Sequence, residues 1–380
     1  MKWQDELKKN ITKIDELKKY FDIPEDEAKK LDEITKVHPM SITRYYLSLI
    51  EKPSPDDPIW RMAVPSVDEF VQIGSYDTSG EQENTKLTGL QHKYSQTALL
   101  LATNRCAMYC RFCFRKRLVG LPNKEILRRL EAAADYISKH PEINNVLISG
   151  GDPLTLPNEI IRKLLEMLWN IDHLEFVRIG SRVPVTFPMR ITDDSELIEI
   201  FREYSSKNGK RLYLVTHFNH PKEITPQSTE AVQKVLNAGV IISNQTVLLR
   251  GVNDDPKVLA TLMRELVRIG VVPYYVFQCR PVMRVKHHFQ VPLVEGVRIV
   301  EEAKKMLDGH SKRFKYAMSH RTGKIEILGI IDDEIYFKYH QAKDPSNLGK
   351  MLKFKIKPDA GWLDDFLEES EAEIACATTT

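Results

Sequence analysis

The stretch 97–113, TALLLATNRCAMYCRFC, joins an apolar run of strand length to a loop that carries three cysteines. Beyond it, short apolar runs alternate with amphipathic stretches at helical spacing. We predict strands at 97–103, 145–149, 176–179, 212–216, 240–249 and 273–278. We predict helices at 124–139, 158–170, 195–206, 229–238, 256–269 and 294–307. This series indicates an α/β fold with a parallel sheet, open or curled into a partial barrel, because parallel neighbours require crossovers of this length.

The sequence on either side of this series has a different character. Residues 1–60 are highly charged and carry one narrow apolar face at helical spacing, which predicts an N-terminal helical extension. Short strands of a closing, hairpin-rich element are predicted at 313–318, 324–328 and 334–339. We therefore expect a helical extension at 1–60, the α/β unit at 61–330, and a β-rich element with an acidic tail at 331–380.

Composition narrows the class of partner. The chain has 380 residues, and 55 Lys and Arg nearly balance 53 Asp and Glu, which gives no electrostatic reason to expect nucleic acid or an anionic membrane. No apolar run approaches the ~18 residues that span a bilayer, and the N-terminus lacks the apolar core of a signal peptide. We therefore expect a cytoplasmic protein that acts on a small molecule.

The cysteine loop is the strongest chemical signal. Cys106, Cys110 and Cys113 have the spacing C-x3-C-x2-C directly after the first predicted strand of the series. Three cysteines can ligate three irons of a four-iron, four-sulfur cluster and leave the fourth iron open to a chelating ligand. The alternative is a zinc site, which needs a fourth ligand such as Cys279, Cys376 or a histidine. The position at the end of a strand favours a cofactor-binding active site.

Polar residues also end three later strands. The motif Ser149-Gly150-Gly151-Asp152 places two glycines where a ligand could approach the backbone, although a simple glycine turn is the alternative. The histidines of THFNHP at 216–221 lack an evident third metal ligand, so they suit a pocket lining better than a metal site. Gln245 suits cofactor contacts or a satisfied interior position. The candidate cofactor contacts from the strands predicted at 212–216 and 240–249 are His217, Asn219 and Gln245.

Six motifs in fixed order give a family resemblance. They are SITRYYLSLIE at 41–51, CAMYCRFCFRKRLVG at 106–120, SGGDPL at 149–154, SRVPVTFPMRIT at 181–192, THFNHPKEIT at 216–225 and NQTVLLRGVND at 244–254. Together they resemble the lysine 2,3-aminomutases of the radical S-adenosylmethionine (radical SAM) superfamily, from about residue 40 to 330. The resemblance implies a partial (β/α)6-type barrel, a 4Fe-4S cluster, S-adenosyl-L-methionine and pyridoxal 5′-phosphate. It also implies migration of an amino group from the α to the β carbon of an amino acid.

The resemblance assigns roles to particular residues. The three cysteines would bind the cluster, and the Ser149–Asp152 motif would hold the amino group of the adenosylmethionine. Arg115 would bind the α-carboxylate of the substrate. Lys93 and Tyr94 would grip the phosphate of pyridoxal phosphate, and Lys324 would bind that cofactor covalently.

Two departures from the family pattern concern pyridoxal phosphate. Lys93 stands where an arginine is usual, and Thr97 aligns with another usual arginine, so the phosphate grip is expected to be weaker or built differently. Lys324 follows one glycine rather than several, and a surface lysine in a hairpin is the alternative reading of this residue.

Two further departures concern zinc and the substrate. Asp255 replaces a cysteine that helps to bind zinc in relatives, and the C-terminal cysteine cluster is absent, so we predict no structural zinc. Arg280 replaces an aspartate, which reverses the charge facing the distal ammonium of lysine and favours a glutamate-like substrate. The alternative is that Arg280 turns away and pairs with a protein carboxylate, which leaves lysine as the family's usual substrate.

The sequence is also compatible with three other functions. They are a radical enzyme of the same fold without pyridoxal phosphate, an aminomutase that acts on a protein-borne lysine, and a non-enzymatic zinc-binding module. As partners we expect an electron donor such as flavodoxin or ferredoxin, and the chain could form a homo-oligomer.

Overall fold

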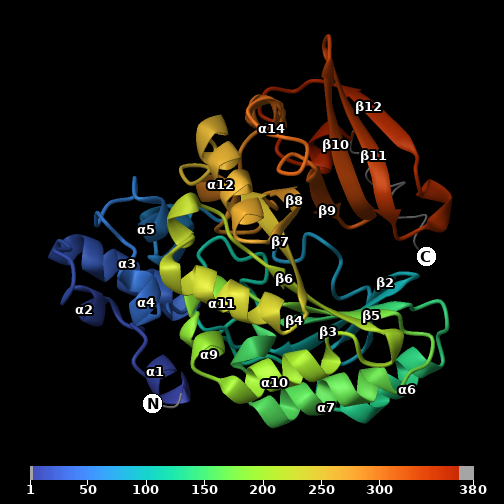
Figure 1. Ribbon diagram of the computed structural model, residues 1–380. Helices are drawn as coiled ribbons and strands as arrows, with labels where there is room; N and C mark the ends of the chain where they lie inside the picture. The colour runs from blue at the N-terminus through green and yellow to red at the C-terminus, as the bar shows by residue number, and fades with distance from the viewer. Residues whose placement is uncertain (1–2, 368–380) are drawn as a thin grey trace.

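The computed structural model describes residues 3–367, so Cys376 and the acidic residues after Leu367 lie outside the described part. The N-terminal extension is helical, as predicted, and lies at one side of the molecule (Figure 1). Its helices are α1 (Trp3–Leu7), α2 (Ile14–Leu17), α3 (Glu25–Val37), α4 (Arg44–Leu47) and α5 (Pro58–Ala63). Thr43 fixes the extension to the next part of the chain, because its hydroxyl donates to the carbonyl of Thr186 at 2.6 Å.

One twelve-stranded sheet runs through the rest of the molecule, with its strands side by side in chain order. Strands β3 to β9 pair in parallel, and the pairs at both ends are antiparallel. The parallel strands are β3 (Thr97–Thr103), β4 (Asn145–Gly150), β5 (Phe176–Gly180), β6 (Arg211–Thr216), β7 (Ile241–Leu248), β8 (Val272–Gln278) and β9 (Lys315–His320). The antiparallel ones are β1 (Thr85–Leu87), β2 (Leu90–Tyr94), β10 (Gly323–Ile331), β11 (Glu334–Ala342) and β12 (Met351–Lys355).

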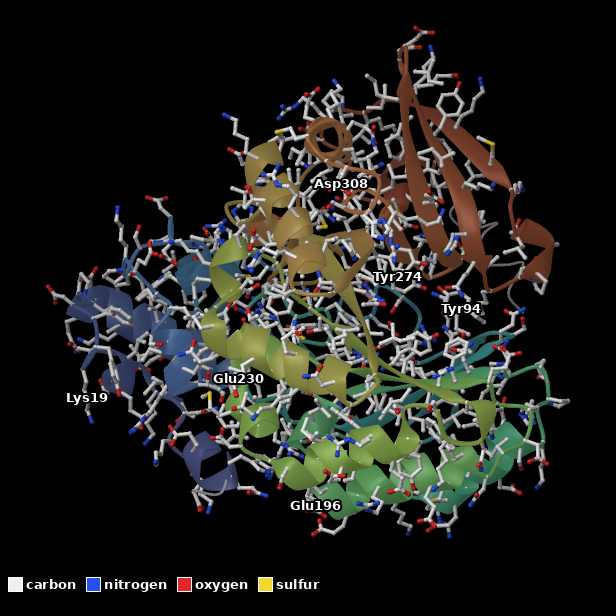
Figure 2. All side chains as sticks on the ribbon, viewed as in Figure 1. Lys19, Tyr94, Glu196, Glu230, Tyr274 and Asp308 are labelled. Carbon is white, nitrogen blue, oxygen red and sulfur yellow. The ribbon has the colours of Figure 1, made fainter. Side chains whose placement is uncertain are left out.

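The parallel strands form the predicted partial barrel, and helices pack on its outer side (Figure 1). Helix α12 shows why, since Leu259, Leu262 and Leu266 recur on one face and are fully buried. Exposed acidic residues such as Glu196 and Glu230 lie on the outer helices (Figure 2). The long outer helices are α6 (Leu130–Ser138), α7 (Asn158–Trp169), α10 (Ser195–Tyr204), α11 (Pro226–Asn237), α12 (Pro256–Arg268) and α14 (Leu293–Lys305). The short ones are α8 (Val183–Thr186), α9 (Met189–Thr192) and α13 (Lys286–Phe289).

One predicted helix begins later than expected, and one predicted hairpin strand also pairs with the barrel. The helix predicted at 124–139 begins only at Leu130, because the backbone N–H of Leu127 donates to the carbonyl of Leu101 and holds this segment against β3. The strand predicted at 313–318 belongs to the closing hairpins, because β9 pairs antiparallel with β10, and it also belongs to the barrel, because its other edge pairs in parallel with β8.

The two expected boundaries fall within structured regions. The boundary after residue 60 lies inside α5, and the boundary after residue 330 lies at the end of β10, which pairs with β11 along its length. The sheet is therefore continuous from the barrel into the C-terminal element. Among residues 3–367, no helix is both long and apolar enough to cross a membrane.

Contacts between distant segments close the open side of the partial barrel. The ammonium of Lys93, on β2, donates to the carbonyl of His320, at the end of β9, at 2.5 Å. Ser75 forms an isolated parallel bridge with Val282, after β8. The hydroxyl of Ser79 accepts a hydrogen bond from Arg280 at 2.8 Å. The segment before β1 therefore crosses from the first strands to the last.

Candidate active site

The barrel encloses a cavity of about 360 Å³. Its walls come from the carboxyl ends of the parallel strands, from the cysteine loop, and from β2 and β10, where a parallel barrel places its active site. Fourteen of the fifteen residues predicted for the site line this cavity: Lys93, Tyr94, Cys106, Cys110, Cys113, Arg115, Ser149, Gly150, Gly151, Asp152, His217, Gln245, Arg280 and Lys324.

The three cysteines reach the cavity from one loop. Burial raises the pKa of each thiol, that of Cys113 to about 11, so deprotonated sulfurs at these positions need positive partners. Among residues 3–367, no three His, Cys, Asp or Glu side chains converge on a single metal ion. A cubane, by contrast, presents a separate iron to each cysteine. Three cysteines that line one cavity supply the ligands for a 4Fe-4S cluster with one open iron, and the guanidinium of Arg182 donates to the sulfur of Cys110 at 2.9 Å.

Buried charges hold the cysteine loop in place. The carboxylate of Glu69 is fully buried and pairs with Arg111 and with Lys116, at 2.6 Å in each case. Burial alone would raise the pKa of Glu69, but the two cations hold it well below its usual range. The N-terminal extension adds a further tie, because the backbone N–H of Tyr109 donates to the carbonyl of Ser41. The extension thus supports the loop that would carry the cluster.

At the two glycines of the Ser149–Asp152 motif, the backbone of a neighbouring segment approaches closely. A Cβ on Gly150, whose φ is +123°, would lie 2.3 Å from the carbonyl oxygen of Thr103. A Cβ on Gly151 would lie 2.2 Å from that of Arg105, and its N–H donates to Thr103 at 2.5 Å. The sequence allowed either ligand approach or a simple glycine turn here; the structure adds a third reason for glycine, because the backbone of Thr103 and Arg105 lies against these residues, which also line the cavity.

Gly151→Ala tests this packing. We expect the substitution to lower the free energy of unfolding by about 1–3 kcal/mol, the usual cost of forcing an extra methyl into a packed site. The measurement is urea denaturation of the iron-free protein. Gly309→Ala is the control, because no atom lies within 4 Å of the Cβ that it adds. Equal stability of the two variants would contradict the close approach.

The imidazole of His217 faces the cavity with an unused nitrogen. Its Nε2 is buried and has no hydrogen-bond partner among the described residues. Burial and the neighbouring Arg182 lower the pKa of His217 to about 3, so the ring is neutral. The amide of Gln245 lines the same wall and also has no protein partner among the described residues. A buried polar atom such as Nε2 of His217 is normally satisfied, so its free state fits a polar ligand such as adenosylmethionine, which the half-buried Gln245 could also contact.

Asn219 is the one predicted site residue that does not line the cavity. Its Oδ1 accepts a hydrogen bond from the backbone N–H of Val247 at 2.9 Å, and its Nδ2 lies 3.7 Å from the sulfur of Met62. The side chain is fully buried and joins the loop after β6 to β7. In this structure it supports the wall of the cavity.

Lys324 lies on β10 with its amine inside the cavity. The amine is 4.4 Å from the ring centroid of Tyr275 and 5.8 Å from that of Phe277. It has no hydrogen bond or ion pair among residues 3–367. Burial is the main cause that lowers the pKa of Lys324 to about 7, and nearby cations, Arg178 first, add to the effect. An amine that is partly neutral at physiological pH is a nucleophile, as covalent binding of pyridoxal phosphate requires.

Beyond the two aromatic rings, the charged groups that act on Lys324 are the cations Arg178, Lys93 and Arg280. Burial, with a contribution from Arg280, lowers the pKa of Lys93 to about 7, and its amine donates to two carbonyls, those of Ser79 and His320. The Nε of Arg178 is buried and unpartnered among the described residues. This concentration of positive groups fits an anionic ligand such as a phosphate.

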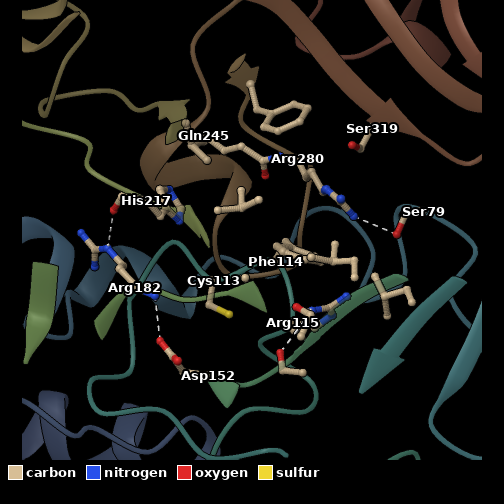
Figure 3. Close-up of a pocket in the computed structure, with 18 of the residues that line it drawn as sticks. Ser79, Cys113, Phe114, Arg115, Asp152, Arg182, His217, Gln245, Arg280 and Ser319 are labelled. Carbon is tan, nitrogen blue, oxygen red and sulfur yellow. Dashed lines mark hydrogen bonds between the residues drawn. The ribbon is translucent and has the colours of Figure 1, made fainter. Parts of the chain in front are cut away.

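Arg280 and Arg115 differ in how many of their hydrogen-bond donors are paired with protein groups (Figure 3). Arg280 donates to the hydroxyl of Ser79 and lies 4.0 Å over the ring of Phe114, and within the described chain it has no carboxylate partner. Arg115 pairs with Glu81 at 2.9 Å and also donates to the Ser149 hydroxyl and the Gly150 carbonyl. Arg280 is therefore the freer of the two.

Sequence reasoning missed three charged residues of the cavity wall, one of which is Glu81, the partner of Arg115. Arg182 was quoted only within a family motif, although it contacts Cys110, and Arg178 was included only in a predicted strand. A usable signal was present for Arg178, because charged residues are rarely buried without a partner or a function. Its position in an otherwise apolar strand could have been read in this way.

Comparisons with known proteins agree with this geometry. Residues 100–263 match the model of the Radical SAM superfamily. The chain is 46% identical, over 95% of its length and 96% of the relative's, to a protein of Aquifex aeolicus (strain VF5) named "Putative L-lysine 2,3-aminomutase". It is 39% identical to the L-lysine 2,3-aminomutase of Clostridium subterminale, over 82% of this chain and 73% of that one.

A further relative has a different named substrate. The chain is 37% identical to the glutamate 2,3-aminomutase of Clostridioides difficile (strain 630), over 79% of this chain and 69% of that one. Members of this family are radical SAM isomerases, and their cofactors are a 4Fe-4S cluster, adenosylmethionine and pyridoxal phosphate. The sequence identity and the extent of the matches show that this chain belongs to the lysine 2,3-aminomutase family of radical SAM enzymes.

Proposed function

We propose that this enzyme is a pyridoxal phosphate-dependent 2,3-aminomutase that acts on a free amino acid with an acidic side chain. The observation that supports it most is the amine of Lys324, which is buried and unpaired among the described residues and opens on the same cavity as the three cysteines. A radical enzyme without pyridoxal phosphate would have no use for such a lysine. This feature therefore favours the aminomutase over the alternative that lacks the cofactor.

Each group in the cavity has a task in this proposal. When bound, the cluster and adenosylmethionine supply a radical for hydrogen abstraction, and pyridoxal phosphate carries the migrating amino group. Cys106, Cys110 and Cys113 hold three irons and leave the fourth open, with electrons from a donor such as flavodoxin or ferredoxin. His217 and Gln245 offer polar atoms to adenosylmethionine. The walls of the partial barrel would limit the access of water and oxygen to the reaction.

A second set of residues would bind pyridoxal phosphate and the substrate. Lys324 would hold the pyridoxal phosphate, and Lys93 and Tyr94, which line the same cavity, would contact its phosphate. Arg115 would bind the α-carboxylate with the donor capacity that Glu81 and Ser149 leave unused.

The substrate preference rests on Arg280. A buried cation without a countercharge costs several kcal/mol, so a guanidinium facing a cavity is normally matched by an anion. Arg280 lines the cavity, and among residues 3–367 it forms no ion pair with a carboxylate. It would therefore repel the distal ammonium of lysine and attract a distal carboxylate. A glutamate 2,3-aminomutase among the relatives shows that the family includes an enzyme named for such a substrate.

Arg280→Asp tests both the reaction and the preference. The assay is anaerobic turnover of single amino acids with dithionite, adenosylmethionine and pyridoxal phosphate, and with detection of the β-amino acid product. We expect kcat/KM of the unmodified protein to be at least about tenfold higher for glutamate or aspartate than for lysine, and Arg280→Asp to reverse this order. One tenfold step corresponds to about 1.4 kcal/mol, which is modest for a buried charge pair.

Arg298→Asp is the matched control, because Arg298 is exposed on α14, outside the cavity. It makes the same charge change and should leave the order of substrates unaltered. Efficient rearrangement of lysine by the unmodified protein, with no improvement in Arg280→Asp, would contradict a role for Arg280 in reading substrate charge. Turnover of a polypeptide lysine instead of free amino acids would favour the enzyme acting on a protein-borne lysine.

A further inference from the structure

Arg182 connects the cysteine loop to the opposite wall of the cavity. It lies two residues after the end of β5, and its backbone N–H donates to the carboxylate of Asp152 at 2.7 Å. Its guanidinium donates through Nη1 to the sulfur of Cys110 at 2.9 Å and through Nε to the carbonyl of His217 at 3.0 Å. Figure 3 shows this side chain between Asp152 and His217. The hydrogen bonds made by the backbone N–H and by Nε therefore hold Nη1 in place beside the sulfur.

The far side of the guanidinium is fixed by a buried acid. Nη2 of Arg182 pairs with the carboxylate of Glu223, which is fully buried. The same carboxylate accepts hydrogen bonds from the hydroxyl of Tyr46 and from the backbone N–H of Asn219, at 2.6 Å in both cases. These donors stabilise the ionised form of Glu223 and hold it against Arg182. The guanidinium therefore cannot turn away from Cys110 without breaking several buried contacts.

Cys110 differs from the other two cysteines in this respect. Among the described residues, no side-chain donor reaches the sulfur of Cys106 or Cys113, whereas Cys110 receives a charged one. Hydrogen bonds to cysteine sulfur, and positive charge beside it, are among the factors that set the reduction potential of an iron–sulfur cluster. The hydrogen bond and the positive charge both stabilise the reduced cluster, which is the more negative of its two states.

We propose that Arg182 is a positioning residue for the cluster, and that its hydrogen bond to the sulfur of Cys110 raises the reduction potential of the bound cluster. The inference rests on the proposed ligation of iron by Cys110. The step is a one-electron reduction by a low-potential donor, such as a flavodoxin, a ferredoxin or dithionite. No proton moves, because Arg182 remains a charged donor in both states of the cluster.

The test compares midpoint potentials in redox titrations followed by electron paramagnetic resonance. The reconstituted protein is used without adenosylmethionine, so that any contact of Arg182 with that molecule cannot contribute. In Arg182→Gln/Glu223→Gln, the hydrogen bond from a cation is lost while the net charge of the pair stays zero. We expect the ratio of reduced to oxidised cluster at a fixed potential to fall about tenfold, which is about 59 mV for a one-electron couple.

Glu223→Gln alone provides a prediction of opposite sign. It keeps the guanidinium on Cys110 but removes its countercharge, so the site becomes more positive and the midpoint potential should rise. Arg190→Gln/Asp194→Asn is the matched control, because Arg190 is also fully buried and pairs with Asp194 at 2.6 Å but has no cysteine contact. Its midpoint potential should equal that of the unmodified protein.

An unchanged potential in the iron-loaded Arg182→Gln/Glu223→Gln protein would overturn the inference, as would a fall in potential for Glu223→Gln. If the double variant fails to bind iron, the sign of the shift in Glu223→Gln decides. An unmodified protein that binds no cluster would refute the proposed function, and with it this inference. A loaded cluster with no effect of Arg182 would refute the inference alone.

Discussion

Alanine in place of Cys106, Cys110 or Cys113 is expected to abolish the reductive cleavage of adenosylmethionine. In the proposed site each thiolate would bind a separate iron of the cubane, so two remaining cysteines would leave a second iron without its protein ligand. Burial raises the pKa of these thiols, which means that none of them stays ionised without iron as a partner. Loss of one ligand should therefore reduce both the bound iron and the yield of 5′-deoxyadenosine, the latter below detection.

The measurement is iron content and 5′-deoxyadenosine release after anaerobic reconstitution. Cys279→Ala is the control, since Cys279 is buried in the same cavity wall but, within residues 3–367, its sulfur hydrogen-bonds only to the carbonyl of Arg280, at 3.7 Å. It should keep its full iron content. Full iron loading together with 5′-deoxyadenosine production by Cys110→Ala would refute the assignment, and binding of zinc instead of iron would favour a zinc site.

The barrel units could be predicted from the sequence because each is a local pattern. The strand predicted at 97–103 matches β3, and the helix predicted at 158–170 ends one residue later than α7. The failures involve distant partners. Nothing near β9 in the chain indicates that it pairs in parallel with β8, and the exposed strand β1 has no apolar alternation to reveal it.

The site residues also divide into those with a local sequence signal, which could be predicted, and those that depend on a distant partner, which could not. The cysteines were identifiable because their spacing carries chemistry, and Arg280 because its charge differs from the family pattern. The pairing of Arg182 with Glu223 was not, since 41 residues separate the two and each also suits an exposed position in sequence. Asn219 resembled its neighbours in the motif, but only the structure shows that its side chain bonds to Val247.

Lys324→Ala is expected to eliminate covalent binding of pyridoxal phosphate while leaving the iron in place. In the unmodified protein, borohydride should fix a pyridoxyl group on the peptide that contains Lys324, and the variant should lose this adduct and its absorbance. The rate of adduct formation should follow the neutral amine. With a pKa of about 7, it should fall about tenfold per unit as pH drops below 7 and level off above about pH 8. A rate that keeps rising to pH 10 would indicate an ordinary lysine.

Lys93→Ala is the decisive comparison, because burial lowers the pKa of both lysines to about 7. The difference between them is hydrogen bonding. The amine of Lys93 donates to the carbonyls of Ser79 and His320, which stabilise its protonated form, whereas that of Lys324 meets only aromatic faces within the described chain. Lys93→Ala should therefore bind pyridoxal phosphate more weakly but still carry the adduct on Lys324. An adduct found on Lys93 would move the covalent site to β2, and no adduct on either lysine would favour a radical enzyme that works without pyridoxal phosphate.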